Sequence, residues 1–238
     1  MPDFQKREPE DVKNMFSKVS KNYDKINRAM CFGLDILWRK KLAKIALSNT
    51  SQKTKIIDIA CGSGDVCIEL AKSNLNAEII GSDFCPEMLK IAEEKIAKAN
   101  LNNRITFQQA DCENLPFDDN SFDAITISFG FRNFQNREKC LNEITRILNL
   151  NGRLAILEVS RTNAIMEFAQ RFFMCFFVPI IASILGGEKQ SYKYLANTTM
   201  SYPYPKDVEK MLANAGLKEI KTYKMGCGLV AITTGVKK

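Results

Sequence analysis

A glycine-rich turn that follows a short apolar run is the clearest chemical signal in the chain. The run covers residues 55–60, KIIDIA, and the turn then places Gly62 and Gly64 on either side of Ser63. A strand, a glycine turn and a helix in this order aim backbone N–H groups at a ligand beyond the carboxyl end of the strand. Because Cys67 stands where a dinucleotide-binding loop has its third glycine, the turn departs from the dinucleotide fingerprint.

Two carboxylates narrow the choice of ligand. Asp58 lies at the end of the first run, where it would repel a pyrophosphate but can help to balance a cationic ligand, such as a sulfonium, through the loop N–H groups and water. Asp83 ends the next run, where an acid can accept hydrogen bonds from both hydroxyls of a ribose. A ribose occurs in NAD and in S-adenosylmethionine alike. Phe84, the next residue, is a further candidate cofactor contact.

Asp111 and Cys112 follow a third apolar run and form a candidate adenine contact. The carboxylate can accept a hydrogen bond from the exocyclic amine, while the Cys112 backbone N–H faces a ring nitrogen. Each feature alone has a plainer explanation, because a lone GxG is often a tight turn, Asp83 can cap a helix and Asp111 can be a turn residue. Their order and spacing together favour S-adenosylmethionine.

The surrounding pattern predicts the elements that position these residues. Apolar runs alternate with helical periodicity, which predicts a doubly wound α/β fold with a parallel sheet. Helices are expected from about Ser63, from Pro86 and from about Asn136, with Gly152 beyond the end of the last one. Two β-like runs close the chain only a few residues apart, so they can pair only as an antiparallel hairpin. The expected strands cover residues 55–60, 77–82, 104–109, 122–129, 152–160, 218–224 and 228–236.

Composition limits the class of protein. The chain has 238 residues, of which 45% are apolar, enough for one well-buried domain. Its eight cysteines include no CxxC pair, which favours reduced thiols and argues against a zinc site or a disulfide framework. Histidine is absent, and with it the commonest general base and metal ligand, so no metal is expected. The net charge of +7 lies mainly at the two ends, and we interpret it as ordinary solvated helix faces.

The chain resembles the ubiquinone/menaquinone biosynthesis C-methyltransferases over nearly its whole length. The resemblance is carried by KVSKNYDKINRAMCFGLDILWRK at 18–40, DIACGSGD at 58–65, LPFDDNSFDAITISFGFRN at 115–133, GRLAILEVS at 152–160, SYKYLAN at 191–197 and GLVAITTG at 228–235. It implies the class I methyltransferase fold, a Rossmann-like, mostly parallel seven-stranded sheet with a C-terminal antiparallel hairpin and a helical cap. The chain departs from the family at Asp111-Cys112, where Asn-Ala is usual, at Cys31, where serine is usual, and at SYPYPKD, residues 201–207.

The resemblance also implies roles for individual residues. Tyr23 and Asp24 would close over the cofactor, and Arg132 and Asn133 would face a polyprenyl quinol. The residues that would contact S-adenosylmethionine are Ser63, Asp83, Asp111, Cys112 and Ser128.

The implied reaction moves a methyl group from sulfur to an aromatic ring carbon beside a phenolate. We assign catalysis to Arg132, whose permanent charge can stabilise the phenolate, or a water or hydroxide that takes the proton. In the alternative, Arg132 pairs with Glu158 and only fixes its loop. The proton acceptor is not identified.

A single domain is expected over residues 1–238, organised as a helical lid (1–50), a cofactor-binding core (51–160), a helical cap over the substrate site (161–205) and a C-terminal helix with a β-hairpin (206–238). The longest charge-free apolar stretch, residues 172–187, is interrupted by Pro179 and falls short of the ~20 residues that a membrane span needs, while the aromatic run at 168–185 belongs to the cap. We predict a buried cap helix broken at Pro179. Such a helix can also line a groove for a polyprenyl tail, with Phe172 and Phe176 facing the substrate, or touch a membrane surface.

Several alternatives stay open. The N-terminus lacks a signal-peptide pattern, so we expect a cytoplasmic protein, with peripheral contact at the inner face of a membrane and a homodimer both left open. An NAD-linked oxidoreductase is disfavoured by Cys67, by the lack of histidine and by the lack of a suitably placed Tyr-x-x-x-Lys pair. No nucleic-acid partner is expected, because an Asn-Pro-Pro-Tyr motif is missing. Methylation of another small molecule or of RNA is the alternative within the class, and the quinol itself can be a demethylmenaquinol or a benzoquinol precursor of ubiquinone.

Overall fold

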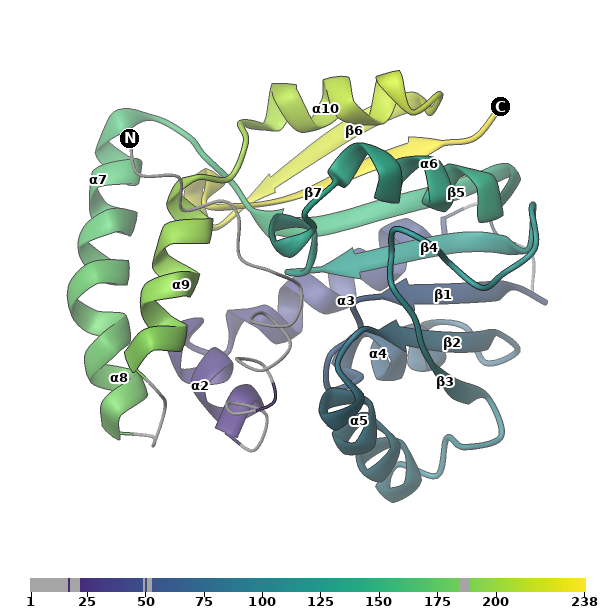
Figure 1. Cartoon of the computed structure of the whole chain (residues 1–238), viewed down its shortest axis with the longest axis horizontal. Coiled ribbons are helices and arrows are strands. Elements are labelled where there is room, and N and C mark those ends of the chain that lie inside the picture. Colours follow the sequence, from purple (N-terminus) through teal and green to yellow (C-terminus); the bar gives the residue numbers. More distant parts are fainter. Residues whose placement is uncertain (1–16, 18–21, 49, 51–52, 185–188) are drawn as a thin grey trace.

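The computed structural model describes residues 17, 22–48, 50, 53–184 and 189–238. Its described strands form one seven-stranded sheet in the order β3-β2-β1-β4-β5-β7-β6 (Figure 1). The strands are β1 (Lys55–Ile59), β2 (Glu78–Asp83), β3 (Ile105–Gln109), β4 (Phe122–Ser128), β5 (Leu148–Val159), β6 (Lys218–Met225) and β7 (Val230–Val236). β1 to β5 pair in parallel, whereas β7 is antiparallel to both β5 and β6. The predicted doubly wound sheet with a C-terminal antiparallel hairpin is confirmed.

Helices cover both faces of the sheet. One face packs against α3 (Leu34–Ala46), α4 (Asp65–Ser73) and α5 (Pro86–Lys98), and the other against α6 (Arg137–Ile147) and α10 (Pro205–Asn214). The strand order reverses between β1 and β4, whose carboxyl ends therefore open a crevice between diverging loops. The short helix η2 (Phe131–Asn133) follows β4 at this point, and η4 (Gly226–Gly228) joins β6 to β7.

A separate group of helices stands beyond the carboxyl ends of the parallel strands, on the left of Figure 1. It comprises α2 (Tyr23–Met30), α7 (Ala164–Phe172), the π-helical turn η3 (Phe173–Phe177), α8 (Val178–Ile184) and α9 (Lys189–Met200). α9 lies in a segment for which the sequence pattern indicated only polar chain between the cap and the next helix. Together these helices place side chains of α2, η3 and α9 over the crevice.

The prediction of a buried helix broken at Pro179 is wrong on both counts. The helix runs on from α7 through η3 into α8, and Pro179 is the second residue of α8. A proline lacks the N–H and crowds the carbonyl four residues earlier, and the wider π-helical turn directly before it absorbs that conflict. α7 and η3 contain no buried residue. Because the helix is continuous, its stretch Ala164–Ile181 is long and apolar enough to cross a membrane by length and composition alone.

Gly152 also differs from its predicted role as a helix stop. α6 ends at Ile147 because Leu148 already has extended dihedrals (φ −74°, ψ 134°), and Gly152 lies inside β5. A Cβ on Gly152 would lie 2.7 Å from the carbonyl oxygen of Asn149. The glycine is therefore needed for a close backbone approach early in the strand.

Candidate active site

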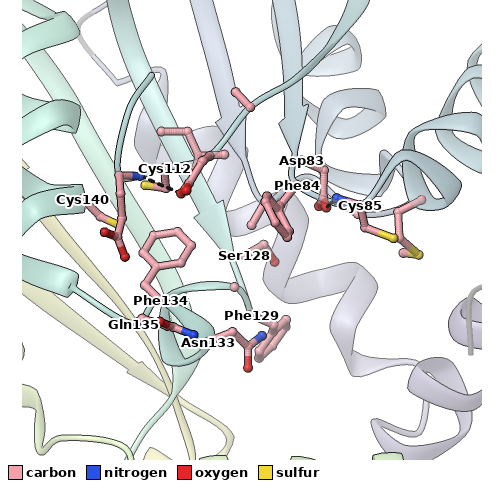
Figure 2. Close-up of a pocket in the computed structure, with 18 of the residues that line it drawn as sticks. Asp83, Phe84, Cys85, Cys112, Ser128, Phe129, Asn133, Phe134, Gln135 and Cys140 are labelled. Carbon is pink, nitrogen blue, oxygen red and sulfur yellow. Dashed lines mark hydrogen bonds between the residues drawn. The ribbon is translucent and has the colours of Figure 1, made fainter. Parts of the chain in front are cut away.

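One cavity lies at the crevice between β1 and β4 and gathers residues from the carboxyl ends of four strands. Among the predicted cofactor residues, it is lined by Tyr23, Gly62, Asp83, Phe84, Asp111, Cys112 and Ser128. Asn133, predicted to face the substrate, lines it as well. Figure 2 shows Asp83, Phe84 and Cys85 on one side of this cavity, Cys112 and Cys140 on the other, and Ser128 between them. We call it the first cavity.

Asp83 ties the glycine turn to the end of β2. Its Oδ2 accepts a hydrogen bond from the Gly62 backbone N–H at 2.8 Å, and its Oδ1 accepts one from the Cys85 N–H at 2.9 Å. Burial raises the pKa of the Asp83 carboxyl above its ordinary value, against the lowering effect of these N–H groups. The Phe84 backbone N–H also hydrogen-bonds to this carboxylate, which borders the cavity and can still accept a hydrogen bond from a ribose hydroxyl.

Asp58, Ser63 and Gly64 do not line the first cavity. Asp58 is 1% exposed, and it accepts hydrogen bonds from the Thr126 hydroxyl at 2.6 Å and the Cys67 thiol at 3.7 Å. Burial raises its pKa to about 7. The pleat of β1 turns this side chain toward α4, so any influence of Asp58 on a ligand must pass through the loop.

Ser63 lies instead in a polar cluster that joins α2 to the glycine turn. Its hydroxyl donates to Asp24 Oδ1 at 2.6 Å and accepts from Lys95 Nζ at 3.0 Å. The same ammonium contacts Asp24 at 2.6 Å and Asp65 at 2.7 Å. α2, α4 and α5 are thus linked through one lysine, which the sequence analysis did not single out.

Gly64 is required for conformation and packing. It has φ +81°, and a Cβ there would lie 3.1 Å from the Cβ of Ala92 on α5. Gly64 therefore allows α4 and α5 to pack closely, whereas Gly62 borders the first cavity.

A second cavity adjoins the first and shares Tyr23, Ser128 and Phe129 with it. Asn27, Asp35, Arg39 and Arg132 contribute polar groups, and Met30, Phe173, Met174 and Leu195 contribute apolar surface. Its lining comes mainly from α2, α3, the end of β4, η2, η3 and α9, with one residue each from α4, β5 and α7. A ligand with a polar head and an apolar tail fits such a lining.

Arg132 lines the second cavity, and it also forms the ion pair with Glu158 that the sequence analysis gave as the alternative to a catalytic role. Its Nη1 lies 2.5 Å from Glu158 Oε1, and its backbone N–H donates to Glu158 Oε2 at 3.1 Å. Burial lowers the pKa of the guanidinium, but the Glu158 carboxylate outweighs it and the pKa lies above its ordinary value. The positive charge is therefore present beside the cavity but is balanced by a buried partner.

The two predicted substrate residues of the cap lie elsewhere. Phe172 and Phe176 are 48% and 59% exposed and line neither cavity. Their neighbours Phe173 and Met174 face the second cavity, because adjacent residues on a helix point in different directions. Asn133 accepts a hydrogen bond from the Tyr194 hydroxyl of α9 at 3.2 Å. The sequence analysis missed Asp35, Arg39 and the cavity-facing side of η3.

Fold and site together define a class I methyltransferase that uses S-adenosylmethionine. A solved methyltransferase of this kind from Methanococcus maripaludis superposes with a TM-score of 0.66 at 23% identity over 93% of each chain. A methyltransferase of Haloferax volcanii in complex with its Trm112 activator gives 0.67 at 17% identity over 93% of this chain and 96% of that one. No group of metal-ligating side chains is present in the part of the chain that the structure describes.

The chain belongs to the ubiE/COQ5 methyltransferase family, whose model matches residues 4–237. A demethylmenaquinone methyltransferase from Thermus thermophilus is 36% identical over 93% of this chain and 99% of its own length. A relative from Porphyromonas gingivalis with the same name is 33% identical over 96% of this chain and 93% of its own length. A ubiquinone/menaquinone biosynthesis C-methyltransferase UbiE from Geotalea uraniireducens is 33% identical over 96% of this chain and 97% of its own length. The protein is therefore an enzyme, and S-adenosylmethionine is its methyl donor.

Proposed function

We propose that this enzyme methylates a ring carbon of a polyprenylated quinol in menaquinone or ubiquinone biosynthesis. The observation that carries the proposal is the pair of cavities that meet at Tyr23, Ser128 and Phe129. The first has the ribose-accepting carboxylate and glycine turn of a donor site, and the second has the polar and apolar lining that a prenylated quinol needs. The names of the relatives support the same acceptor class.

The residues of the first cavity fit S-adenosylmethionine. Asp83 would accept a hydrogen bond from the ribose hydroxyls, and Asp111 with the Cys112 N–H would hold the adenine edge. Gly62, Phe84, Ser128 and Tyr23 would contact the rest of the molecule. The bound sulfonium would supply a methyl group for transfer to a nucleophile, with S-adenosylhomocysteine as the leaving group. Asp58 and Ser63 would support the turn from beneath rather than touch the cofactor.

In the second cavity, Arg132 would stabilise negative charge that develops on the quinol oxygen. Its pairing with Glu158 holds the guanidinium in place but reduces its net field. Asn133, anchored by Tyr194, would orient the ring from the side of the first cavity. Relatives named for menaquinone alone and for both quinones leave two acceptors to be tested.

The direct test is a methylation assay with labelled S-adenosylmethionine and three acceptors presented in detergent: a demethylmenaquinol, a prenylated benzoquinol precursor of ubiquinone and bulk RNA. We expect label on the ring carbon of one or both quinols, identified by mass spectrometry of the product. Label on RNA with none on either quinol would refute the proposal. Accumulation of the matching unmethylated quinone in cells that lack the protein identifies the natural acceptor.

We further propose that the enzyme meets its substrate at the inner face of a membrane. The exposed apolar surface includes Ile165, Phe168, Phe172, Phe176, Ile180 and Ile184 on α7–α8, with Phe32 in the turn before α3 and Leu37 in its first turn. Phe32 and Phe173 join the two parts, with ring centroids 5.9 Å apart. Phe173 also borders the second cavity, so a tail leaving that cavity would meet this surface. An apolar helix face of this kind lies in the interface of a bilayer.

Vesicle binding tests the membrane contact. The triple variant F168S/F172S/F176S should bind vesicles of phosphatidylcholine and phosphatidylglycerol at least about tenfold more weakly than wild type, because three large apolar side chains leave the lipid. L75S/L150S serves as the matched control, since Leu75 and Leu150 are exposed apolar residues away from α7–α8. Equal binding by all three proteins would contradict the proposal, as would a vesicle-independent dimer that the triple variant abolishes.

A further inference from the structure

Methylation of a quinol ring carbon replaces a ring hydrogen by a methyl group and releases one proton, and the chain has no histidine to accept it. The second cavity offers several titratable side chains. Burial raises the pKa of the Tyr23 phenol above its ordinary value, and burial together with the nearby Asp35 carboxylate raises the pKa of the Cys31 thiol to about 11. Both therefore keep their protons, and Arg39 and Arg132 are cations. Asp35 is the one carboxylate among the described residues that line this cavity.

Asp35 has an unusual arrangement for a buried acid. The residue is 1% exposed, and its Oδ2 pairs with Arg39 and lies 3.4 Å from Arg28 Nη1. Its Oδ1 has no hydrogen-bond partner within the described part of the chain. A buried carboxylate oxygen without a donor costs free energy, because it has lost its contacts with water. Asp35 lines the second cavity but Oδ1 itself is enclosed, so a ligand hydroxyl that shifts the surrounding groups and donates a hydrogen bond to Oδ1 would make the arrangement favourable.

We propose that Asp35 Oδ1 accepts the hydroxyl proton of the quinol and is the general base of the methyl transfer. As the O–H bond breaks, its electron pair moves into the ring, the ring carbon bonds to the methyl group, and the methyl–sulfur bond breaks. The product of this step is a neutral dienone beside protonated Asp35. The dienone then loses its ring hydrogen as a proton to water while Asp35 returns its proton to the oxygen. The two steps release one proton, restore the quinol and leave the carboxylate ionised.

The charged groups around Asp35 suit this role. Arg39 is shared with Asp65, whose Oδ2 lies 3.1 Å from Arg39 Nη1, so the local charges of the two carboxylates are offset by Arg28 and Arg39. The two arginines hold Oδ2 in place and leave Oδ1 as the proton acceptor. Arg132, on the η2 side of the same cavity, is available to the negative charge that appears on the quinol oxygen. This inference rests on the proposed quinol acceptor.

The first test measures binding and needs no turnover. The probes are a 2-prenyl-1-naphthol, which is stable to oxidation, and its methyl ether, each titrated in the presence of S-adenosylhomocysteine. Wild type should prefer the naphthol by about 10- to 100-fold, because only the naphthol donates a hydrogen bond to the carboxylate. Asp35→Asn, which can keep its oxygen on Arg39 and turn an NH₂ donor toward the cavity, should reduce that preference to about threefold or less. An equal preference in both proteins overturns the inference.

The second test follows the rate of quinol methylation against pH. Asp35→Asn should lower kcat on the order of 100-fold or more near pH 7. The deficit should shrink as the pH rises toward the quinol's own ionisation at about 10, because hydroxide then makes the phenolate without the enzyme. Asp65→Asn is the matched control, since it removes the other carboxylate from Arg39 but lines neither cavity, and it should keep the wild-type pH dependence.

The outcomes separate this inference from the proposed function. A pH-independent loss in Asp35→Asn, or the same profile in Asp65→Asn, would assign Asp35 a structural role while leaving quinol methylation intact. If wild type methylates no quinol, the proposed function fails, and the naphthol titration still decides whether Asp35 receives a hydroxyl donor.

Discussion

At the scale of single residues, the site depends on carboxylates in three different settings. Asp83 accepts backbone N–H bonds beside the first cavity, Asp35 at the second has one buried oxygen with no partner among the described residues, and Asp58 is enclosed beneath the glycine turn. The sequence shows all three as acids near predicted strand or helix ends. Whether such an acid meets ligand, cation or core depends on the direction in which its Cα–Cβ bond leaves the backbone, which only the folded chain fixes.

The first prediction concerns the effect of Asp58 on the stability of the fold. Burial raises its pKa from an ordinary 3.8 to about 7. Between these values the unfolded chain gives up the proton before the folded chain does, so the stability that this group contributes is present below about pH 4 and is lost as the pH rises to 7. Asp58→Asn should therefore raise the free energy of unfolding by about 2 to 4 kcal/mol at pH 8, since one pKa unit is about 1.4 kcal/mol.

Denaturant titrations at pH 8 and pH 5 check this prediction. The advantage of Asp58→Asn should be much smaller at pH 5, because the wild-type carboxyl is then mostly protonated in the folded protein. An advantage that is the same at both values of pH would show that the pKa of Asp58 is not raised, and a loss at pH 8 would show that Asp58 is stabilised as the anion by the Thr126 and Cys67 donors.

Arg132 makes the second prediction. Arg132→Gln leaves the buried Glu158 without its partner, which should cost about 3 to 5 kcal/mol of stability and obscure any catalytic effect. The double variant R132Q/E158Q removes both charges and should recover most of that stability. If the guanidinium stabilises the phenolate, the folded double variant should still lose kcat by about 100-fold, with S-adenosylmethionine affinity within about twofold. Near-normal turnover in the double variant would reduce Arg132 to a loop-fixing residue.

At the scale of elements, α2 of the predicted lid is attached to the glycine turn by Lys95. This ammonium contacts Asp24 on α2, Asp65 on α4 and the Ser63 hydroxyl. Tyr23, on the same lid helix, lines both cavities, so the position of α2 decides how each cavity is closed. A partly exposed ion-pair cluster of this kind contributes little to global stability but can fix one orientation of a helix.

Lys95→Met is therefore predicted to loosen the lid and to spare the core. We expect the melting temperature to fall by no more than about 4 °C, as for a loss of about 1 kcal/mol in a chain of this size. Hydrogen exchange in Tyr23–Met30 should become severalfold faster, while exchange in the sheet is unchanged. Lys72→Met, which removes a lysine paired with Glu69 on α4, is the control and should alter neither. Unchanged exchange in α2 would contradict the attachment.

The helix α7–α8 shows why part of the site could not be predicted from sequence. Its aromatic residues and Pro179 are visible in the sequence, and they favoured a buried, broken helix. The π-helical turn keeps the helix continuous and shifts its faces, so that Phe173 and Met174 reach the cavity while Phe172 and Phe176 point outward. The spacing of apolar residues in the sequence cannot reveal that a single π-helical turn rotates the faces of a helix.

At the scale of the whole molecule, the sheet was predictable and the second cavity was not. Each parallel strand is a short apolar run followed by its own turn, so local pattern and chain connectivity were enough for β1 to β7. The residues Gly62, Asp83, Asp111 and Ser128 follow those strands and therefore meet at one edge. Asp35 and Arg39 reach the second cavity only because α3 packs beside β4, a contact between distant segments that no local pattern encodes.

The last prediction concerns how the cofactor stabilises the whole chain. A ligand that binds only the folded state adds about 2.7 kcal/mol when it is present at 100 times its Kd, which corresponds to about 5 to 10 °C in the melting temperature of a domain this size. S-adenosylmethionine should give this shift and NAD should give none. Asp83→Ala should weaken S-adenosylmethionine by about 1.5 to 3 kcal/mol and leave a shift of no more than about 5 °C at the same concentration. Asp118→Ala, an exposed acid that lines neither cavity, should keep the full shift. A full shift in melting temperature in folded Asp83→Ala would contradict the assignment of the ribose hydroxyls to this carboxylate.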